Sequence, residues 1–273
     1  MKTITNSLQR TYRFMAAILT FIGLVFLISC QKDAVNQDNL IGSAASLKKV
    51  KIDKGFARDA DGHIYKTVVI GTQTWMAENL RTTKFNDGES IPLVSSDLQW
   101  TDVEGWPIHS PAYCYYDYNV KNGTIYGALY DWTAVNTGKL CPTGWHVPTD
   151  KEWTTLTDYL GEKASNKLRE ATDKYWYNNF ISEDTYPTNE TGFTALPGGT
   201  RVVVVVDDGS PVTHTREYFD GLNVASTWWT SSAVENDYYN SWVMYLSGDT
   251  KDVVTWPAYR SQASAVRCIM DTN

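Results

Sequence analysis

The sequence CPTGWHVPTDKEW, residues 141–153, contains the clearest helix start in the chain. Thr149 and Glu152 have the spacing of a capping box, in which each side chain bonds the backbone N–H of the other residue. Gly161 supplies a stop signal. Between these points one helical face is apolar, formed by Trp153, Leu156 and Leu160. The segment therefore predicts a helix that begins after Thr149, ends at Gly161 and packs on a sheet.

A hairpin is predicted upstream of this helix. Residues 63–70 are rich in β-branched side chains and follow the turn pair Asp61-Gly62. Gly71-Thr72 then leads to residues 73–76, which we expect to pair back on the first strand. Asp59-x-Asp61-Gly62 resembles the start of a calcium loop, but it lacks the later ligands of such a loop and predicts a plain turn.

Two further elements are expected on either side of the helix. Aromatic runs at 113–118 and 125–132 are separated by Asn122-Gly123, which predicts a second hairpin. After the helix, residues 162–171 predict a second, short helix with Ala164 and Leu168 facing inward.

The last third of the chain is β-rich. Residues 201–206 and 212–219 flank a turn sequence, and the five consecutive valines suit a strand that is covered on both faces or paired at an interface. Further strands are expected at 228–232, 241–246, 252–256 and 263–270.

The N-terminus reads as a lipoprotein signal over residues 1–29. Lys2, Arg10 and Arg13 give a cationic start, and residues 14–28 are apolar apart from Thr20. The core ends in Leu27-Ile28-Ser29-Cys30, which resembles the bacterial lipobox, so we expect cleavage before Cys30 and lipidation of its thiol. The alternative is an ordinary secretory peptide with an incidental cysteine.

Residues 30–54 are expected to form a lipidated flexible tether. From Gln31 to Lys54 there is no aromatic residue, and the polar composition cannot bury enough apolar surface to fold. Gln31-Lys32-Asp33 is similar to a surface-export signal, although it could equally be the start of the tether. We therefore expect an outer-membrane, lipid-anchored protein that faces the cell exterior, with the membrane as a partner.

The charge of the chain disfavours a nucleic-acid partner. Residues 1–29 hold three of the 24 basic residues and none of the 31 acidic ones. The net charge of the mature chain is therefore more negative than the −7 of the whole chain. Eleven Trp and 17 Tyr stand beside only eight Phe. Aromatic rings with a polar edge suit proteins that contact sugars, although they also build β-rich cores.

The cysteines and histidines predict no metal site or cofactor. Cys114, Cys141 and Cys268 remain after lipidation, which leaves three possible pairings and one leftover thiol. None has C-x-x-C spacing, and the four histidines His63, His109, His146 and His214 are scattered singly.

The motifs taken together resemble the major paralogous domain named from Fibrobacter succinogenes. The resemblance spans nearly all of residues 59–271 and predicts one domain over 55–273. Its parts are Asp61-Gly62-His63-x-Tyr65, Ile70-Gly71-x-Gln73-x-Trp75-Met76-Ala77-Glu78-Asn79-Leu80, Tyr126-Gly127-x-Leu129-Tyr130-x-Trp132, Cys141-Pro142-x-Gly144-Trp145-His146-Val147-Pro148-x-x-x-Glu152-Trp153, Thr188-Asn189-x-x-Gly192-Phe193, Leu196-Pro197-Gly198-Gly199, Trp228-Trp229-Thr230-Ser231-Ser232 and Val266-Arg267-Cys268.

This family looks related in fold to C-type lectin-like domains and to the formylglycine-generating enzymes. The resemblance implies an α+β fold with short antiparallel strands and one or two helices. In lectin-like folds the final strand runs beside the segment that enters the first helix, which implies a Cys141–Cys268 disulfide and a free, buried Cys114. Cys114 is the alternative partner for either cysteine.

Three functions follow as hypotheses. The preferred one is a non-enzymatic extracellular module that binds a glycan or another matrix ligand. Its contact residues would be aromatic side chains expected in loops: Trp106, Tyr175, Trp176, Trp256 and Tyr259. The alternatives are an oxidase similar to the formylglycine generators and a component of a surface assembly that adds the strand at 202–206 to a neighbour's sheet. No catalytic residue is predicted, because the motif residues suit turns, packing and capping.

Overall fold

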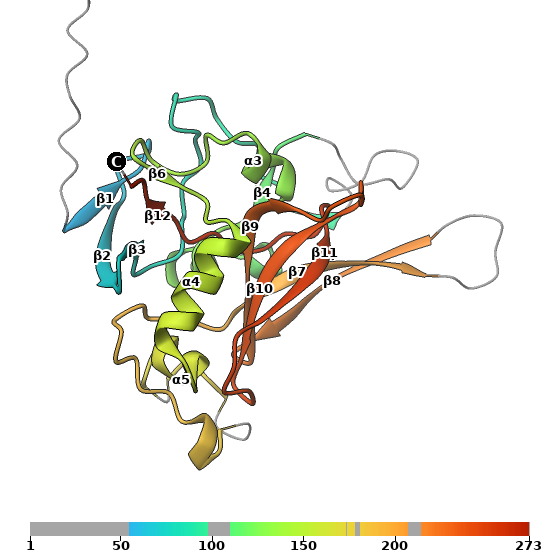
Figure 1. Ribbon diagram of the computed structural model, residues 1–273. Coiled ribbons are helices and arrows are strands. Elements are labelled where there is room, and N and C mark those ends of the chain that lie inside the picture. The colour runs from blue at the N-terminus through green and yellow to red at the C-terminus, as the bar shows by residue number, and fades with distance from the viewer. Residues whose placement is uncertain (1–54, 98–109, 173, 178–180, 207–213, 273) are drawn as a thin grey trace, which may run out of the picture. The chain divides into compact units, whose positions relative to one another are not determined.

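A computed structural model describes residues 55–97, 110–172, 174–177, 181–206 and 214–272 (Figure 1). Predictions that concern the signal, Cys30, the tether and Trp106 lie outside these ranges. Among the residues that are described, no helix is both long and apolar enough to cross a membrane.

One five-stranded sheet gathers strands from both ends of the folded chain. Its order is β1 (Phe56–Arg58), β2 (Ile64–Ile70), β3 (Gln73–Met76), β12 (Ile269–Met270) and β6 (Trp145–His146), and every neighbouring pair is antiparallel. The hairpin predicted around Gly71 is confirmed, because Ile70 pairs with Gln73 and Gly71 has a φ of +61°. The final strand thus lies beside the segment that leads into the predicted helix.

The second five-stranded sheet is built by the C-terminal part of the chain. Its order is β11 (Val254–Tyr259), β10 (Asn240–Ser247), β9 (Ala225–Ala233), β7 (Gly198–Val206) and β8 (His214–Leu222). β7 and β8 form the predicted antiparallel ribbon, which extends beyond the other strands in Figure 1. The backbone pairing of β7 with β9 is parallel and joins Gly199 to Ser226.

Helix α4 (Asp150–Leu160) connects the two sheets, and its capping box is confirmed. The Thr149 hydroxyl accepts from the Glu152 N–H at 3.2 Å, and a Glu152 carboxylate oxygen accepts from the Thr149 N–H at 2.8 Å. Trp153 packs on Trp75 of β3, with ring centroids 4.8 Å apart, and on Trp228 of β9, at 6.1 Å. The short helix α5 (Ala164–Leu168) buries the two predicted residues.

The hairpin predicted at Asn122-Gly123 is wrong, because this pair lies in helix α2 (Val120–Tyr126). The Asn119 side chain caps α2 by accepting from the Lys121 N–H. A Cβ at Gly123 would lie 2.2 Å from the Tyr115 ring, so the glycine permits close packing and not a turn. The two aromatic runs do pair, but only over the short strands β4 (Tyr113–Cys114) and β5 (Leu129–Tyr130) among the described residues.

The fold class is α+β, with more helices than the one or two expected. The described residues contain four α-helices, since α3 (Trp132–Asn136) joins α2, α4 and α5, and two 3₁₀ turns, η2 (Tyr116–Tyr118) and η4 (Glu183–Thr185). The strand predicted at 263–270 is also reduced to β12. Upstream of β12, Ala263 bridges Arg201 and Ala265 exchanges backbone bonds with β9, so this segment fills the gap where β7 and β9 separate.

The predicted disulfide is confirmed. Cys141 and Cys268 are bonded, with Cα atoms 6.0 Å apart, and Cys114 is free and buried. The bridge ties the segment before α4 to the segment before β12.

Candidate functional site

A cavity of about 580 Å³ lies on the C-terminal sheet. We call it the sheet cavity, and the lining side chains that carry the argument are Thr200, Tyr218, Asp220, Tyr245, Trp256 and Gln262. Side chains from all five strands meet there, since Thr200 of β7 pairs with Asp220 of β8, Thr227 of β9 pairs with Tyr245 of β10, and Trp256 lies on β11 beside β10. Successive strand residues point to opposite faces. Trp228 packs against α4, so its neighbour Thr227 and the cavity lie on the face away from that helix.

Aromatic rings stand at both ends of the sheet cavity. Trp256 on β11 stacks on Tyr245 of β10, with ring centroids 4.6 Å apart and planes 25° apart, and Trp256 remains 42% exposed. Tyr218 on β8 is 47% exposed. Large, exposed and rigid rings of this kind provide apolar faces on which a ligand can stack.

A hydroxyl network forms the polar part of the cavity between these rings. The Gln262 amide nitrogen donates to the Thr200 hydroxyl at 3.1 Å and to the Ser264 hydroxyl at 2.9 Å. Thr227 Oγ1 lies 2.9 Å from Ser264 Oγ. The positions of these groups are therefore fixed by neighbouring groups before any ligand binds, which reduces the ordering cost of binding.

The predicted contact residues are not all at this cavity. Trp256 lines it. Tyr259 is 39% exposed but lies three positions further along β11, so its side chain points to the opposite face. Both residues are in a strand, so the loop prediction for them is wrong. The nearby Pro257 suggested a loop, but β11 is at the edge of the sheet, where proline is tolerated.

The prediction that Trp176 is a surface contact is wrong. Its side chain is 2% exposed and packs beneath the Arg169 guanidinium, which is 5.2 Å from the ring centroid. Tyr175 is half-buried against Tyr126, at 6.2 Å between centroids, and does not line the sheet cavity. Of the predicted contact residues that the structure describes, Trp256 alone is therefore brought to the site.

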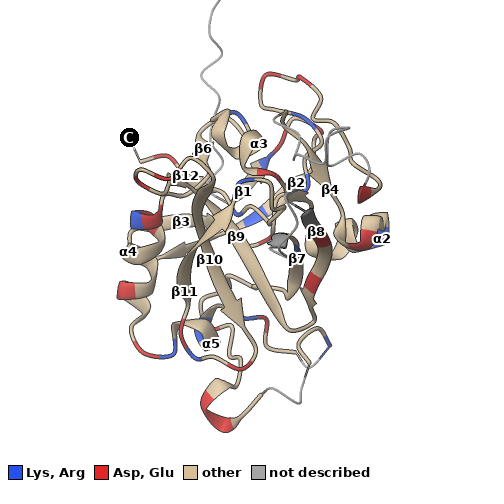
Figure 2. Ribbon diagram, turned by 90° about the vertical axis from the view of Figure 1, so that its right-hand side faces the viewer, with Lys and Arg blue, Asp and Glu red and all other residues tan. Residues whose placement is uncertain are grey.

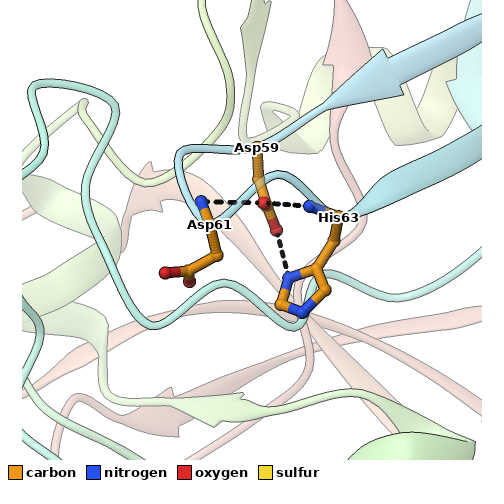
Figure 3. A group of neighbouring side chains, drawn as sticks. All are labelled: Asp59, Asp61 and His63. Carbon is orange, nitrogen blue, oxygen red and sulfur yellow. Dashed lines mark hydrogen bonds and ion pairs between the residues drawn. The ribbon is translucent and has the colours of Figure 1, made fainter.

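A second group consists of Asp59, Asp61 and His63, whose possible ligand atoms lie within 4.8 Å of one another (Figure 3). Asp59 already accepts from the backbone N–H groups of Asp61 and His63, at 3.0 and 2.8 Å. Its other oxygen accepts from the Tyr65 hydroxyl at 2.5 Å and lies 2.9 Å from His63 Nδ1. Lys84 Nζ lies 3.3 Å from Asp61. The carboxylate oxygens of Asp59 and Asp61 are therefore already used in hydrogen bonds and an ion pair that hold the turn together. We assign no metal to this group.

A third group surrounds His146 in the Trp-His-Val-Pro motif. Its Nε2 lies 2.8 Å from Glu152 and its Nδ1 lies 2.6 Å from Asp271. The bond to Glu152 raises the pKa of His146 to about 9, although burial opposes the rise, and the bond to Asp271 adds to it. An imidazolium has no lone pair for a metal or for base catalysis. The group is a clamp between α4 and the C-terminal end of the chain.

Residues from four of the motifs meet around Asn79. Its side-chain oxygen accepts from Trp228 Nε1 at 2.8 Å and from Arg267 Nε at 3.0 Å. The Arg267 guanidinium lies 4.2 Å from the Phe193 ring centroid, and burial lowers the pKa of Arg267 to about 9. These residues are deep in the core. They support the interpretation that the motifs specify the fold.

Comparison with known proteins gives one match. A family model described as the Fibrobacter succinogenes major domain matches residues 68–270. This range contains Asn79, Arg267 and the residues of the sheet cavity. The chain matches no curated protein and no solved structure.

Proposed function

Because the chain belongs to the Fibrobacter succinogenes major domain family, whose description names no activity, we propose from its own cavity that it is a surface lipoprotein that binds a glycan. The observation that carries the proposal is the exposed Trp256 ring beside the polar groups of the sheet cavity. A sugar ring has an apolar face edged by hydroxyls. Aromatic stacking combined with directional hydrogen bonds is the chemistry that suits such a ligand.

The proposed fold relation to C-type lectin-like domains supports the same function. The Cys141–Cys268 bridge lies where that relation implied it, between the segment that enters α4 and the end of the chain. Fold likeness alone does not specify a ligand, so the proposal rests on the cavity.

The surface location is proposed from the sequence. A lipidated Cys30 and a polar tether would hold the folded part at the membrane, where the sheet cavity could meet extracellular polysaccharide.

The oxidase alternative receives less support from the cysteines. It needs two nearby thiols, whereas Cys141 and Cys268 are bonded to each other. Cys114 is the one free thiol within the described ranges, and burial raises its pKa to about 12. A thiol with that pKa is neither nucleophilic nor a ready metal ligand near neutral pH.

The assembly alternative keeps the strand at 202–206 as its candidate contact. This strand pairs with β8 along one side, and the pairing of β7 with β9 lies further back along β7, at Gly199. β8 forms the outer edge of the same sheet and is a second place where a neighbour's strand could add.

The test is binding of the purified full-length chain to a panel of immobilised oligosaccharides. Trp256→Ala should weaken binding of the best panel member by about tenfold or more, since it removes the stacking face. Tyr259→Ala is the matched control, because this residue is similarly exposed on the same strand but points away from the cavity. Loss of binding in both variants, or in neither, would contradict the proposed site. If the unaltered chain binds no oligosaccharide of the panel, glycan binding itself is contradicted.

A further inference from the structure

The described lining of the sheet cavity consists of neutral residues and a single carboxylate. Among the described residues that line it, Asp220 is the one charged side chain, and there is no Lys, Arg or His. Figure 2 shows β9, β10 and β11 without charged residues, whereas β8 contains Arg216, Glu217 and Asp220. Within the described lining of the cavity, an anionic ligand would therefore meet a carboxylate and no cation.

The orientation of Gln262 adds a second acceptor. The Thr200 hydroxyl donates its only proton to the Ala263 carbonyl at 2.8 Å, so it must accept from the Gln262 amide. This fixes the nitrogen of Gln262 toward Thr200 and Ser264, and the amide oxygen toward other partners. Within the described residues neither this oxygen nor the Asp220 carboxylate has a hydrogen-bond partner.

We infer that the sheet cavity selects neutral, hydroxyl-rich glycans and rejects glycans that carry carboxylate or sulfate groups. This inference rests on the proposed glycan-binding function and specifies which class of glycan the cavity binds. Asp220, the one charged group in the described lining, and the Gln262 oxygen are acceptors, so the cavity favours a ligand that supplies donors, as sugar hydroxyls do. The Tyr218 hydroxyl and the Trp256 indole N–H are neutral donors, which a sugar hydroxyl can also use because it accepts as well as donates. Carboxylate and sulfate groups have only acceptors to offer and would repel Asp220.

The experiment compares three probe sets of matched length on the purified full-length chain: neutral glucan and mannan oligosaccharides, oligogalacturonates, and sulfated heparin-type oligosaccharides. At low salt the neutral set should bind at least about tenfold more tightly than either acidic set. Asp220→Lys should raise binding of the acidic sets by about tenfold, because it replaces repulsion with attraction. Asp220→Asn should raise it less.

Asp158→Lys is the control for net charge. It makes the same charge change on the exposed face of α4, which packs on the other side of the sheet, and should leave the preference unchanged. Acidic probes that bind the unaltered chain as tightly as neutral ones would overturn the inference but leave glycan binding intact. An equal gain in Asp158→Lys and Asp220→Lys would also overturn it. Failure of every probe set would instead contradict the proposed function itself.

Discussion

His146 connects two distant parts of the chain through its two ring nitrogens. One contacts Glu152 in the first turn of α4, and the other contacts Asp271 after β12. Burial acts to raise the pKa of Glu152, but the bonds from His146 and Thr149 outweigh it and lower that pKa to about 2. The shared network therefore holds charges of opposite sign on the two residues near neutral pH.

We predict that this clamp stabilises the fold at pH 6 and not at pH 10. The pKa of His146 is about 9 in the folded chain against 6.5 for a free histidine, so its contribution is complete below 6.5 and is lost as the pH rises through 9. His146→Gln should lower the free energy of unfolding by about 1 kcal/mol or less at pH 6, because the partly exposed pair is screened by solvent.

Urea unfolding of the unaltered chain and the variant at both pH values measures this effect. A difference in stability that stays the same from pH 6 to pH 10 would show that the protonated imidazole is not its source.

The aromatic residues show what sequence could predict at this scale. Trp176 stands close to Asn178 and Trp256 beside Pro257, which suggested loops for both. Trp176 is nevertheless buried beneath Arg169, whereas Trp256 is exposed on an edge strand. Composition gave no means to separate them. The sequence did place Trp256 among the candidates, whereas Tyr218, Asp220, Thr200 and Gln262 were missed. Thr200, Tyr218 and Asp220 share a face through the pairing of β7 with β8, and Gln262 joins them from the segment before β12.

At the scale of elements, the last segment of the chain holds several others together. Ala263 and Ala265 bond to β7 and β9, Ile269 pairs with Trp75 and His146, and Cys268 is bonded to Cys141. The disulfide closes a loop with a sequence separation of 127. Its loss should therefore loosen the junction of both sheets with α4.

We predict that replacing both Cys141 and Cys268 with alanine lowers the free energy of unfolding by about 4 to 5 kcal/mol, since a long loop is released in the unfolded chain. Urea unfolding measures the loss. Cys114→Ala is the control, because it removes a buried thiol without opening a loop. A double variant no less stable than the control, or a peptide map that links Cys114 to another cysteine, would contradict this role.

The elements that sequence predicted well were those with local signals. The capping box from Thr149 to Glu152 fixed the start of α4, and Gly71 fixed the first hairpin. The hairpin predicted at Asn122-Gly123 failed, because this glycine is required by close contact with the Tyr115 ring and not by a turn. Such contacts depend on tertiary packing, which local patterns do not report.

At the scale of the whole molecule, the proposed lipid anchor depends on one residue outside the described ranges. Cys30→Ala should abolish incorporation of a clickable fatty acid in cells and slow removal of the signal, because no other thiol lies near the cleavage site. Cys114→Ala should label normally. A Cys30→Ala protein that still takes up lipid would contradict the lipoprotein assignment.

The arrangement of the two sheets explains why a site forms on one of them. Trp153 of α4 contacts Trp75 and Trp228, so the helix covers one face of the C-terminal sheet and leaves the other face to form the sheet cavity. Sequence motifs predicted the family and the fold class. They could not predict the cavity, because the signature residues Asn79, Phe193 and Arg267 are in the core.

The central claim, that the sheet cavity binds a neutral glycan against Trp256, is tested most directly by indole N–H signals in ¹H–¹⁵N spectra. The chain has 11 tryptophans, and Trp256→Phe identifies the signal of interest. Titration with the tightest-binding neutral oligosaccharide should shift the Trp256 signal while those of the buried Trp176 and Trp228 stay in place. A titration that saturates binding but leaves the Trp256 signal unmoved would contradict the account.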